Sequence, residues 1–343
     1  MKSIKIKKPD EPNAKPSYTV VNDSAPILGE HDLRVRIEAS CPSIPPTSIL
    51  HTLYNKRNMN SIPLGGEFVG KITQIGLDVK RFKVGDRVAG SLSMLNETYS
   101  VCSNVIATSE YEVAKLDYTI NPGKFVATLS EGLRAYVALH VLGNVKRDNS
   151  ILIFDGIRQP NLACSVIAKK LGLQVFVTTR DSEETEKAIK YALQSIESSK
   201  LSDVSGKIIE ETGEIGVDVV IDNGVDVFGN KDKRLPEKID IIRCLGLNGR
   251  WITRQHDLQL DPPDSSLLYM KAASISYIPP SSLSSLSANK GTQLHIFDEI
   301  ISLYQDGSVE ASIMKTVSWK DALEFFSNDD PFERFENVVF VSE

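Results

Sequence analysis

The sequence lacks the residue patterns that mark several large enzyme classes. Its four cysteines are widely separated and never form a Cys-x-x-Cys pair, so neither a disulfide framework nor a zinc quartet is expected. No HExxH, GxSxG or Walker pattern occurs, which argues against zinc-dependent or nucleophilic hydrolysis and against a P-loop. We therefore expect a metal-free protein in a reducing, cytoplasmic setting.

The sequence also has no excess of positive charge and no long apolar run. The net charge of -6 argues against a broad phosphate-binding face, because nucleic-acid affinity comes mainly from clustered Lys and Arg. No run approaches the ~20 apolar residues of a membrane span, and the N-terminus has no apolar signal-peptide core. With 343 residues, 41% of them hydrophobic, the chain can form two domains with proper cores. We expect neither a direct nucleic-acid patch nor a membrane span.

Residues 150–177 read as the first half of a parallel α/β sheet. The pattern predicts a strand at 151–154, a turn at 155–159, a helix at 160–171 and a second strand from Gln174. Such a turn commonly holds a dinucleotide phosphate, and glycines there let the backbone approach it closely. Gly156 is the only glycine among the five turn residues here. These residues therefore decide whether a cofactor can bind.

Residues 63–90, PLGGEFVGKITQIGLDVKRFKVGDRVAG, place glycines at turn positions between short strands and predict a compact β-barrel. The run closely resembles the pattern GxExxGxVxxxGxxVxxxxxGDRVxG of the medium-chain dehydrogenase/reductase superfamily. Glu67 carries the family's glutamate, and it could act in catalysis or as a buried hydrogen-bond partner in the barrel. Gly66 stands where the zinc-dependent members have a histidine ligand, so the resemblance implies a zinc-independent protein.

Residues 129–142, LSEGLRAYVALHVL, resemble the domain-linking helix of the quinone oxidoreductase branch of this superfamily. The resemblance implies an α/β fold with two domains. A discontinuous GroES-like β-barrel domain would cover 1–122 and 281–343, and a Rossmann domain with a doubly wound parallel sheet would cover 123–280. The last Rossmann strand would pair with its twin in a homodimer. Within this domain, the spacing of Ala188, Ile189, Ala192 and Ile196 predicts one face of an amphipathic helix.

Two further runs, at residues 210–225 and 258–273, resemble a zeta-crystallin-like branch of the same family. Relatives of that branch are subunits of the FERRY complex, an endosomal assembly that links early endosomes to mRNA. The resemblance implies other subunits of such a complex as partners. It also implies a cytoplasmic protein that could associate with early endosomes.

The quinone oxidoreductases bind NADPH through a GxxGxxG turn, and all three glycine positions are lost here. They become Asp155, Arg158 and Asn161, with Gly156 between the first two. A carboxylate about 4 Å from a phosphate charge costs about 1 to 4 kcal/mol, which weakens binding about tenfold or more. Arg158 could form an ion pair with Asp155 that plugs the turn, or it could bind phosphate by charge. The first alternative predicts that no cofactor binds.

Other candidate residues follow from the same resemblance. Arg180 ends the second strand, where this superfamily often meets the 2′-phosphate of NADP, although a surface arginine is equally compatible with the sequence. The family's Asn-Pro-x-Asp loop aligns with residues 43–46 and leaves the hydroxyl of Ser43, with Tyr54 nearby as a second weak catalytic candidate.

Three functions therefore remain open. The chain could be a non-catalytic assembly subunit without a cofactor. It could be a zinc-independent, NADPH-dependent quinone or enone reductase that transfers hydride to a small carbonyl substrate. It could also be a sensor that binds nucleotide without turnover. The lost glycines and the lost Asn-Pro-x-Asp loop favour the first of these.

Overall fold

The computed structural model describes residues 1–8, 17–44, 50, 60–93, 98–197, 204–226, 235–279, 290–328 and 338–342. The chain forms two compact units, Met1–Leu133 with Pro280–Glu343 (unit 1) and Arg134–Pro279 (unit 2). The first boundary between these units lies inside helix α2 (Pro122–Tyr136), whereas the sequence suggested residue 122. The start of α2 bonds within unit 1, where Lys124 Nζ lies 2.6 Å from Glu310 Oε1.

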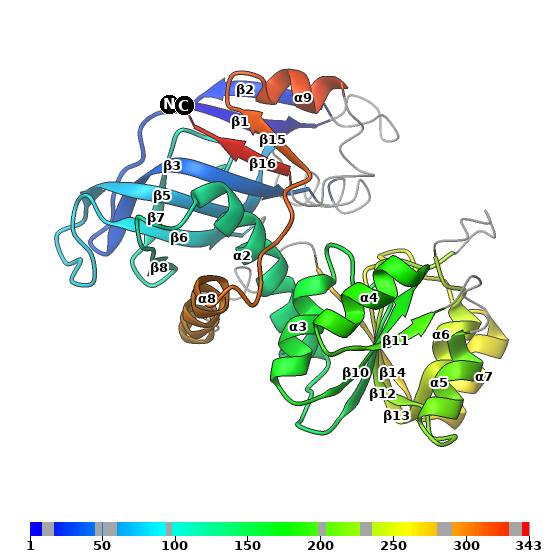
Figure 1. The fold of residues 1–343 in the computed structure, drawn as a ribbon. Helices are drawn as coiled ribbons and strands as arrows, with labels where there is room; N and C mark the ends of the chain where they lie inside the picture. The colour runs from blue at the N-terminus through cyan, green and yellow to red at the C-terminus, as the bar shows by residue number, and fades with distance from the viewer. Residues whose placement is uncertain are drawn as a thin grey trace. The chain divides into compact units, whose positions relative to one another are not determined.

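Unit 1 is built on a seven-stranded, mainly antiparallel sheet of order β15-β16-β3-β5-β6-β8, in which β7 also pairs with β3. A three-stranded sheet of order β2-β1-β4 accompanies it (Figure 1). The strands are β1 (Lys2–Lys7), β2 (Ser17–Asn22), β3 (Asp32–Ser43), β4 (Ser61–Pro63), β5 (Gly65–Ile75), β6 (Arg87–Leu92), β7 (Val105–Ser109), β8 (Val113–Lys115), β15 (Lys315–Ser318) and β16 (Val338–Val341). The helices are α8 (Lys290–Gln305) and α9 (Ala322–Asn328).

Gly66 shows why the start of β5 excludes a side chain. Its φ is +131°, and a Cβ atom there would lie 2.3 Å from the carbonyl oxygen of Cys41 on the neighbouring strand β3. Only glycine tolerates both the backbone conformation and this approach. The position that carries a histidine ligand in zinc-dependent relatives is therefore closed to any ligating side chain.

Unit 2 is a doubly wound sheet of six parallel strands in the order β11-β10-β9-β12-β13-β14. The strands are β9 (Ser150–Ile153), β10 (Gln174–Thr179), β11 (Gln194–Glu197), β12 (Val217–Ile221), β13 (Leu245–Thr253) and β14 (Ser274–Tyr277). The helices are α3 (Leu162–Lys170), α4 (Ser182–Lys190), α5 (Val204–Glu211), α6 (Lys238–Cys244) and α7 (Pro262–Met270). In Figure 1, α3 and α4 lie on one side of the sheet, and α5, α6 and α7 lie together on the other. The strand order reverses between β9 and β12, and a ligand of such a sheet binds beyond the strand ends at this point.

The predicted helical face of Ala188, Ile189, Ala192 and Ile196 was wrong. Helix α4 ends at Lys190, and Ala192 adopts a left-handed backbone with φ +55°. The chain then forms β11, in which Ile196 is buried and pairs with Thr178 of β10. Ile196 can be buried in the sheet only if its backbone is extended. This tertiary packing outweighs the helical spacing of the four apolar residues.

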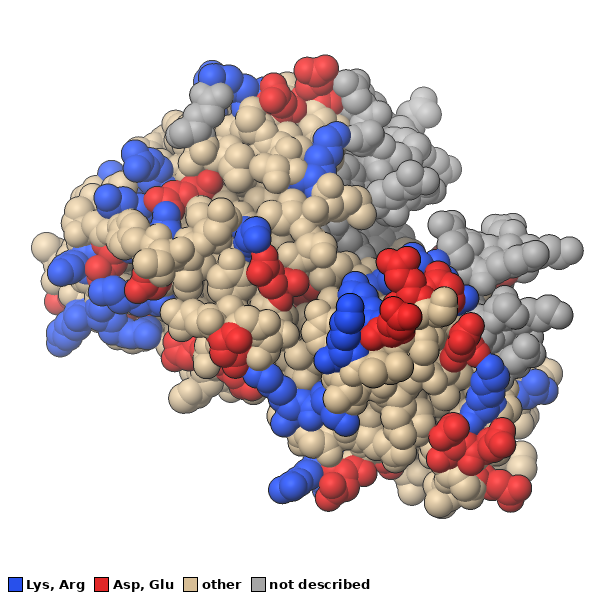
Figure 2. Space-filling view, in the orientation of Figure 1, with Lys and Arg blue, Asp and Glu red and all other residues tan. Residues whose placement is uncertain are grey.

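Helix α2 continues as a π-helical segment, η1 (Val137–Leu142). Among the described residues, the combined helix Pro122–Leu142 is the one helix long and apolar enough to cross a membrane. In its most apolar 18-residue window, 72% of the residues are buried within the fold, as expected of a core helix. Lys, Arg, Asp and Glu side chains are interspersed over the face of the molecule drawn in Figure 2.

Candidate functional site

The candidate site is the turn that joins β9 to α3, at the reversal point of the parallel sheet. Asp155 follows the strand in a left-handed conformation with φ +50°. Gly156 comes next, and a Cβ atom there would lie 2.4 Å from Val177 Cγ1 and 2.8 Å from Ser165 Oγ. This one remaining glycine therefore allows α3 and β10 to pack closely.

Because Gly156 is enclosed, replacing it by alanine should destabilise unit 2. Overpacking of this kind costs about 1 to 3 kcal/mol, and we expect such a loss in urea unfolding of Gly156→Ala. Gly206→Ala is the matched control, because no atom lies within 4 Å of a Cβ placed at Gly206 in α5. The control should be neutral or slightly stabilising. Equal unfolding midpoints for the two variants would contradict the packing argument.

Four charged side chains form a network around the turn. Arg180 Nη2 lies 2.7 Å from Asp155 Oδ1, and Arg158 Nε forms an ion pair with Glu184 Oε1. The backbone N–H of Arg180 also donates to Glu184 Oε2 at 2.9 Å. The pair that the sequence suggested, Asp155 with Arg158, is therefore replaced by two pairs that tie the turn to β10 and α4. Both guanidinium groups therefore form ion pairs with carboxylates of the protein itself.

The pKa of Asp155 is raised above its ordinary value. Burial of the carboxyl is the largest cause, and the neighbouring charges and hydrogen bond of Arg180 oppose it. Its side chain is mostly buried but still 22% exposed, so solvent and a ligand can reach the carboxylate. A ligand phosphate at this position would meet an acidic group directly.

Several backbone amides of the turn and of the start of α3 also donate to acceptors within the protein. Asp155 N–H donates to Thr178 Oγ1 at 2.8 Å, and Arg158 N–H donates to the carbonyl of Asp155 at 2.9 Å. The N–H groups of Asn161 and Leu162 both donate to the carbonyl of Arg158 at 2.9 Å. A dinucleotide-binding turn instead presents its amides to phosphate. Here they stabilise the turn itself.

Asn161 stands at the third of the lost glycine positions. Its side chain is buried and donates from Nδ2 to the carbonyl of Phe154 at 2.8 Å. It occupies the N-cap position of α3 but makes no side-chain cap bond to the helix. Asn161 therefore fastens the start of α3 to the end of β9.

Of the candidate residues in unit 1, the structure describes Ser43 and Glu67. Ser43 ends β3, is buried, and pairs with Gly65. Tyr54, with Pro45 and Pro46 of the proline-rich loop, lies outside the described residues. Glu67 is buried between β3 and β6, where Ser91 Oγ donates to its Oε1 at 3.2 Å. This contact gives Glu67 the role of a buried hydrogen-bond partner in the sheet.

Asp222 is a polar residue of this region that the sequence analysis did not single out. It follows β12 directly, is fully buried, and accepts hydrogen bonds from Trp251 Nε1 (2.5 Å), Thr253 Oγ1 (2.9 Å) and the Gly224 N–H (2.8 Å). Burial raises its pKa to about 6, against the effect of these donors. The signal in the sequence was the polar Asp-Asn-Gly that ends a buried strand. Asp222 joins the ends of β12 and β13 beside the turn.

Metal chemistry finds no support in the described residues. Within them no group of three or more His, Cys, Asp or Glu side chains could hold a metal ion. All four cysteines are free and buried. Burial raises the pKa of the Cys164 thiol, near the start of α3, to about 12, so this thiol is a poor nucleophile.

Comparison with known proteins agrees with the fold of both units. Residues 29–139 match the alcohol dehydrogenase GroES-like domain. The chain is 30% identical to mouse quinone oxidoreductase-like protein 1 over 291 residues, which cover 81% of this chain and 82% of that protein. It is also 25% identical over 199 residues to the phthioceranic/hydroxyphthioceranic acid synthase of Mycobacterium tuberculosis H37Rv, covering 57% of this chain but 9% of that protein.

Solved structures share the whole fold. Quinone oxidoreductase of Escherichia coli, determined as a complex with NADPH, matches with a TM-score of 0.74 and 19% identity over 99% of this chain and 100% of that one. An alcohol dehydrogenase superfamily protein from Novosphingobium aromaticivorans matches with a TM-score of 0.76 and 18% identity over both full chains. A GroES-like unit combined with a six-stranded parallel sheet defines the medium-chain dehydrogenase/reductase class. Within that class, the chain belongs to the quinone oxidoreductase-like family.

Proposed function

We propose that this quinone oxidoreductase-like protein uses no dinucleotide cofactor and serves as a non-catalytic subunit of a larger assembly. One observation carries the proposal: the charged side chains of the turn after β9, and several of its backbone amides, bond to protein partners. Asp155 is held by Arg180, and Arg158 is held by Glu184. A dinucleotide would have to break these pairs and would then face the Asp155 carboxylate. The protein is, on this view, a pseudoenzyme.

The proposed partners follow from one edge of unit 2 and from the resemblance of two runs. β14 is the last strand of its sheet, and Tyr277 at its end is 47% exposed. Tyr269 and Met270, at the end of α7 that leads into the start of β14, are 87% and 74% exposed. An edge strand beside exposed apolar side chains suits pairing with a second copy of this chain. Residues 210–225 and 258–273 support partnership with subunits of a FERRY-type endosomal complex in the cytoplasm and at early endosomes.

The second candidate is a zinc-independent, NADPH-dependent quinone or enone reductase. It is favoured by the fold, because the Escherichia coli relative with the same architecture was solved with NADPH. In this chain Arg180 would have to leave Asp155 to read the 2′-phosphate, and Arg158 would have to leave Glu184. The cost of breaking both pairs weighs against this candidate.

Titration of the full chain with NADPH, followed by cofactor fluorescence and then by turnover with an ortho-quinone, separates the two. We expect no saturation at about 1 mM NADPH, which corresponds to a binding free energy weaker than about −4 kcal/mol, and no consumption of cofactor. Escherichia coli quinone oxidoreductase is the positive control. Saturable binding with steady turnover would overturn the non-catalytic assignment. Light scattering on the same preparation tests the edge-strand dimer, which a monomeric mass would exclude.

A further inference from the structure

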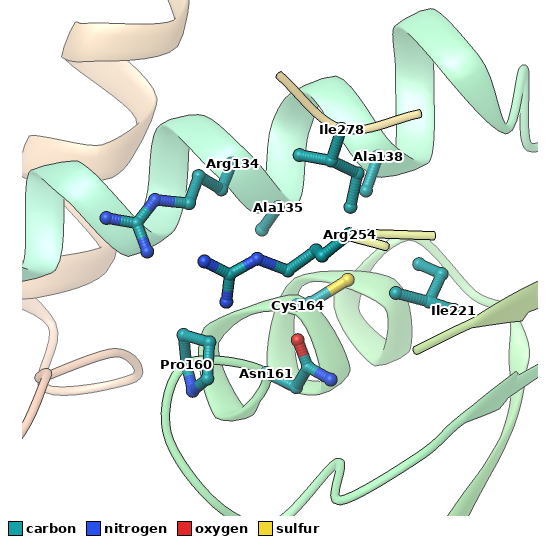
Figure 3. Close-up of a pocket in the computed structure, with 9 residues that line it drawn as sticks. All are labelled: Arg134, Ala135, Ala138, Pro160, Asn161, Cys164, Ile221, Arg254 and Ile278. Atoms are coloured by element: carbon teal, nitrogen blue, oxygen red, sulfur yellow. The ribbon is translucent and has the colours of Figure 1, made fainter. Parts of the chain in front are cut away.

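Unit 1 contains a surface cleft that is separate from the turn after β9. Its volume is about 630 Å³, within the ~300–1,000 Å³ typical of small-molecule sites. All of its lining residues are described and belong to unit 1. The pocket beside the start of α3 in unit 2, whose lining side chains Figure 3 shows, has a volume of about 20 Å³, little more than the ~10–15 Å³ that one water needs. The cleft in unit 1 can therefore hold an organic ligand, which the smaller pocket cannot.

The cleft forms where two strands leave the same edge of β3. The pairing of β7 with β3 stops at Arg36, and the pairing of β16 with β3 starts at Ala39. Just beyond β16, the Ser342 N–H donates to the carbonyl of Glu38 at 2.9 Å. The turn that follows β15, which contains Trp319, lies along the β16 side of the cleft. The gap between β7 and β16 is therefore built into the sheet.

A row of three cations crosses the sheet beside the cleft. Arg36 of β3 stands opposite Lys71 of β5, which stands opposite Arg87 of β6. Arg87 Nε lies 2.7 Å from Glu38 Oε2, and Lys71 Nζ lies 5.9 Å from the centroid of the Tyr118 ring. Arg36 is exposed, and it forms no ion pair or side-chain hydrogen bond with any residue that the structure describes. Since like charges directly opposite each other are destabilising, an anion at Arg36 would be favourable.

The donors of the cleft favour a carboxylate over a phosphate. Phosphate sites commonly present several free backbone N–H groups. Here four lining residues donate their N–H groups to carbonyls of the protein: Ile37, Asn104, Trp319 and Ser342. The guanidinium group of Arg36 instead offers a planar fork of two N–H donors, which matches the two oxygens of one carboxylate.

The uncharged part of the lining favours a flat apolar group beside that carboxylate. The half-buried side chain of Trp319 packs against the core of unit 1 and lines the cleft, as does Val105 at the start of β7. Aromatic side chains bind planar rings by offset stacking or by edge contacts. Lys320 adds a second positive charge to the lining, and the one acidic lining residue, Glu38, is paired with Arg87. The cleft therefore suits an aromatic ring that carries a carboxylate.

We infer that this cleft binds a small aromatic carboxylate, with the carboxylate on the Arg36 guanidinium group and the ring against Trp319. The site goes beyond the proposed function, because it requires neither a dinucleotide nor a partner subunit. The cleft is lined by β3, by the start of β7, by the turn after β15 and by the residue after β16. A bound ligand would therefore hold these segments together and stabilise unit 1.

Titration of the full chain with phenylacetate, followed by tryptophan fluorescence, tests the site. Trp319 is the reporter, because Trp251, the other tryptophan, is fully buried in unit 2. We expect a saturable change with half-saturation below about 10 mM, which a ligand of about ten non-hydrogen atoms can reach. Arg36→Gln removes the charge-assisted pair and should raise the half-saturation concentration about ten- to hundredfold. Arg147→Gln, at an exposed arginine of unit 2, is the matched control and should bind like the wild type.

Three further ligands separate the two parts of the site. Phenylacetamide keeps the ring without the charge, and acetate keeps the charge without the ring, so each should require about tenfold more ligand or greater. Inorganic phosphate should bind more weakly than phenylacetate. Phenylacetate should also raise the thermal unfolding midpoint of the wild type and, because a planar ring is kept, of Trp319→Phe.

Several results would overturn the site. These are the absence of saturation with phenylacetate, equal half-saturation for the wild type and Arg36→Gln, equal binding of phenylacetate and phenylacetamide, and tighter binding of phosphate. Arg36 is exposed and lies outside the core, so Arg36→Gln should fold, and its unfolding midpoint without ligand checks this. The NADPH titration concerns the turn after β9 in unit 2, so failure of either proposal leaves the other standing.

Discussion

Replacing Asp222 by alanine should lower the free energy of unfolding of unit 2 by about 3 kcal/mol at pH 8. The change leaves three buried donors, on Trp251, Thr253 and Gly224, without their acceptor. Each unsatisfied buried donor costs about 1 to 3 kcal/mol, and removal of a buried carboxylate offsets part of that sum. Because Asp222 lies where β12 and β13 end beside the turn, this loss should also loosen the candidate site.

The pKa of the Asp222 carboxyl determines in which direction the free energy of unfolding changes with pH. Its pKa is about 6 in the folded protein, whereas an unfolded aspartate has a pKa near ~3.9. Between these values the folded state binds more protons than the unfolded state, so stability falls as pH rises. The fall amounts to about 3 kcal/mol for a shift of about two units, and it is complete above about pH 6. Asp222→Asn does not titrate and should lack it.

Urea unfolding between pH 4.5 and 8 measures both effects. Trp251 reports on unit 2, and a Trp319→Phe background removes the signal of the only other tryptophan. Asp86 and Glu110 of unit 1 have lowered pKa values and contribute in the opposite direction, but equally in the wild type and the variant. The difference between wild type and Asp222→Asn therefore isolates one carboxyl. Parallel pH profiles would show that Asp222 does not titrate near pH 6.

Restoring glycine at the three lost positions should create dinucleotide affinity. In Asp155→Gly/Arg158→Gly/Asn161→Gly, the carboxylate no longer opposes a phosphate, and Arg180 is released from its ion pair. The removed repulsion of about 1 to 4 kcal/mol corresponds to about ten- to several-hundredfold tighter NADPH binding. Glycine also suits position 155, where φ is +50°. Fluorescence titration with NADPH measures the gain.

Two controls make this result specific. Asp148→Gly removes another aspartate with a left-handed backbone, φ +69°, ahead of the opposite end of β9, and should leave affinity unchanged. Titration with NADH in the triple variant, and with NADPH after an added Arg180→Ala, tests whether Arg180 reads the 2′-phosphate. A triple variant that still binds nothing would show that the closed turn is not what excludes the cofactor.

Much of the fold could be predicted from the sequence, because strong local patterns specify it. Of the glycines in residues 63–90, Gly76 and Gly85 lie between strands as predicted, whereas Gly65, Gly66, Gly70 and Gly90 lie within β5 and β6. Close approach of neighbouring strands explains why Gly66 admits no side chain. The strand, turn, helix and strand of residues 150–177 lie within a few residues of their predicted bounds. Such elements are set by backbone conformation and short-range burial, which one sequence displays directly. Ile196 was misplaced because its burial depends on a neighbouring strand.

The sequence by itself determined that the turn after β9 has lost its three glycines and that Gly156 remains. Only the tertiary structure decided how the replacing side chains are paired. Asp155 and Arg158 are neighbours in sequence, but parallel pairing of Val177 with Ile153 brings the ends of β10 and β9 together. Arg180 therefore reaches Asp155, and Glu184 on α4 reaches Arg158. Charged side chains pair with whatever the fold brings within a few ångströms, and no local pattern records that distance.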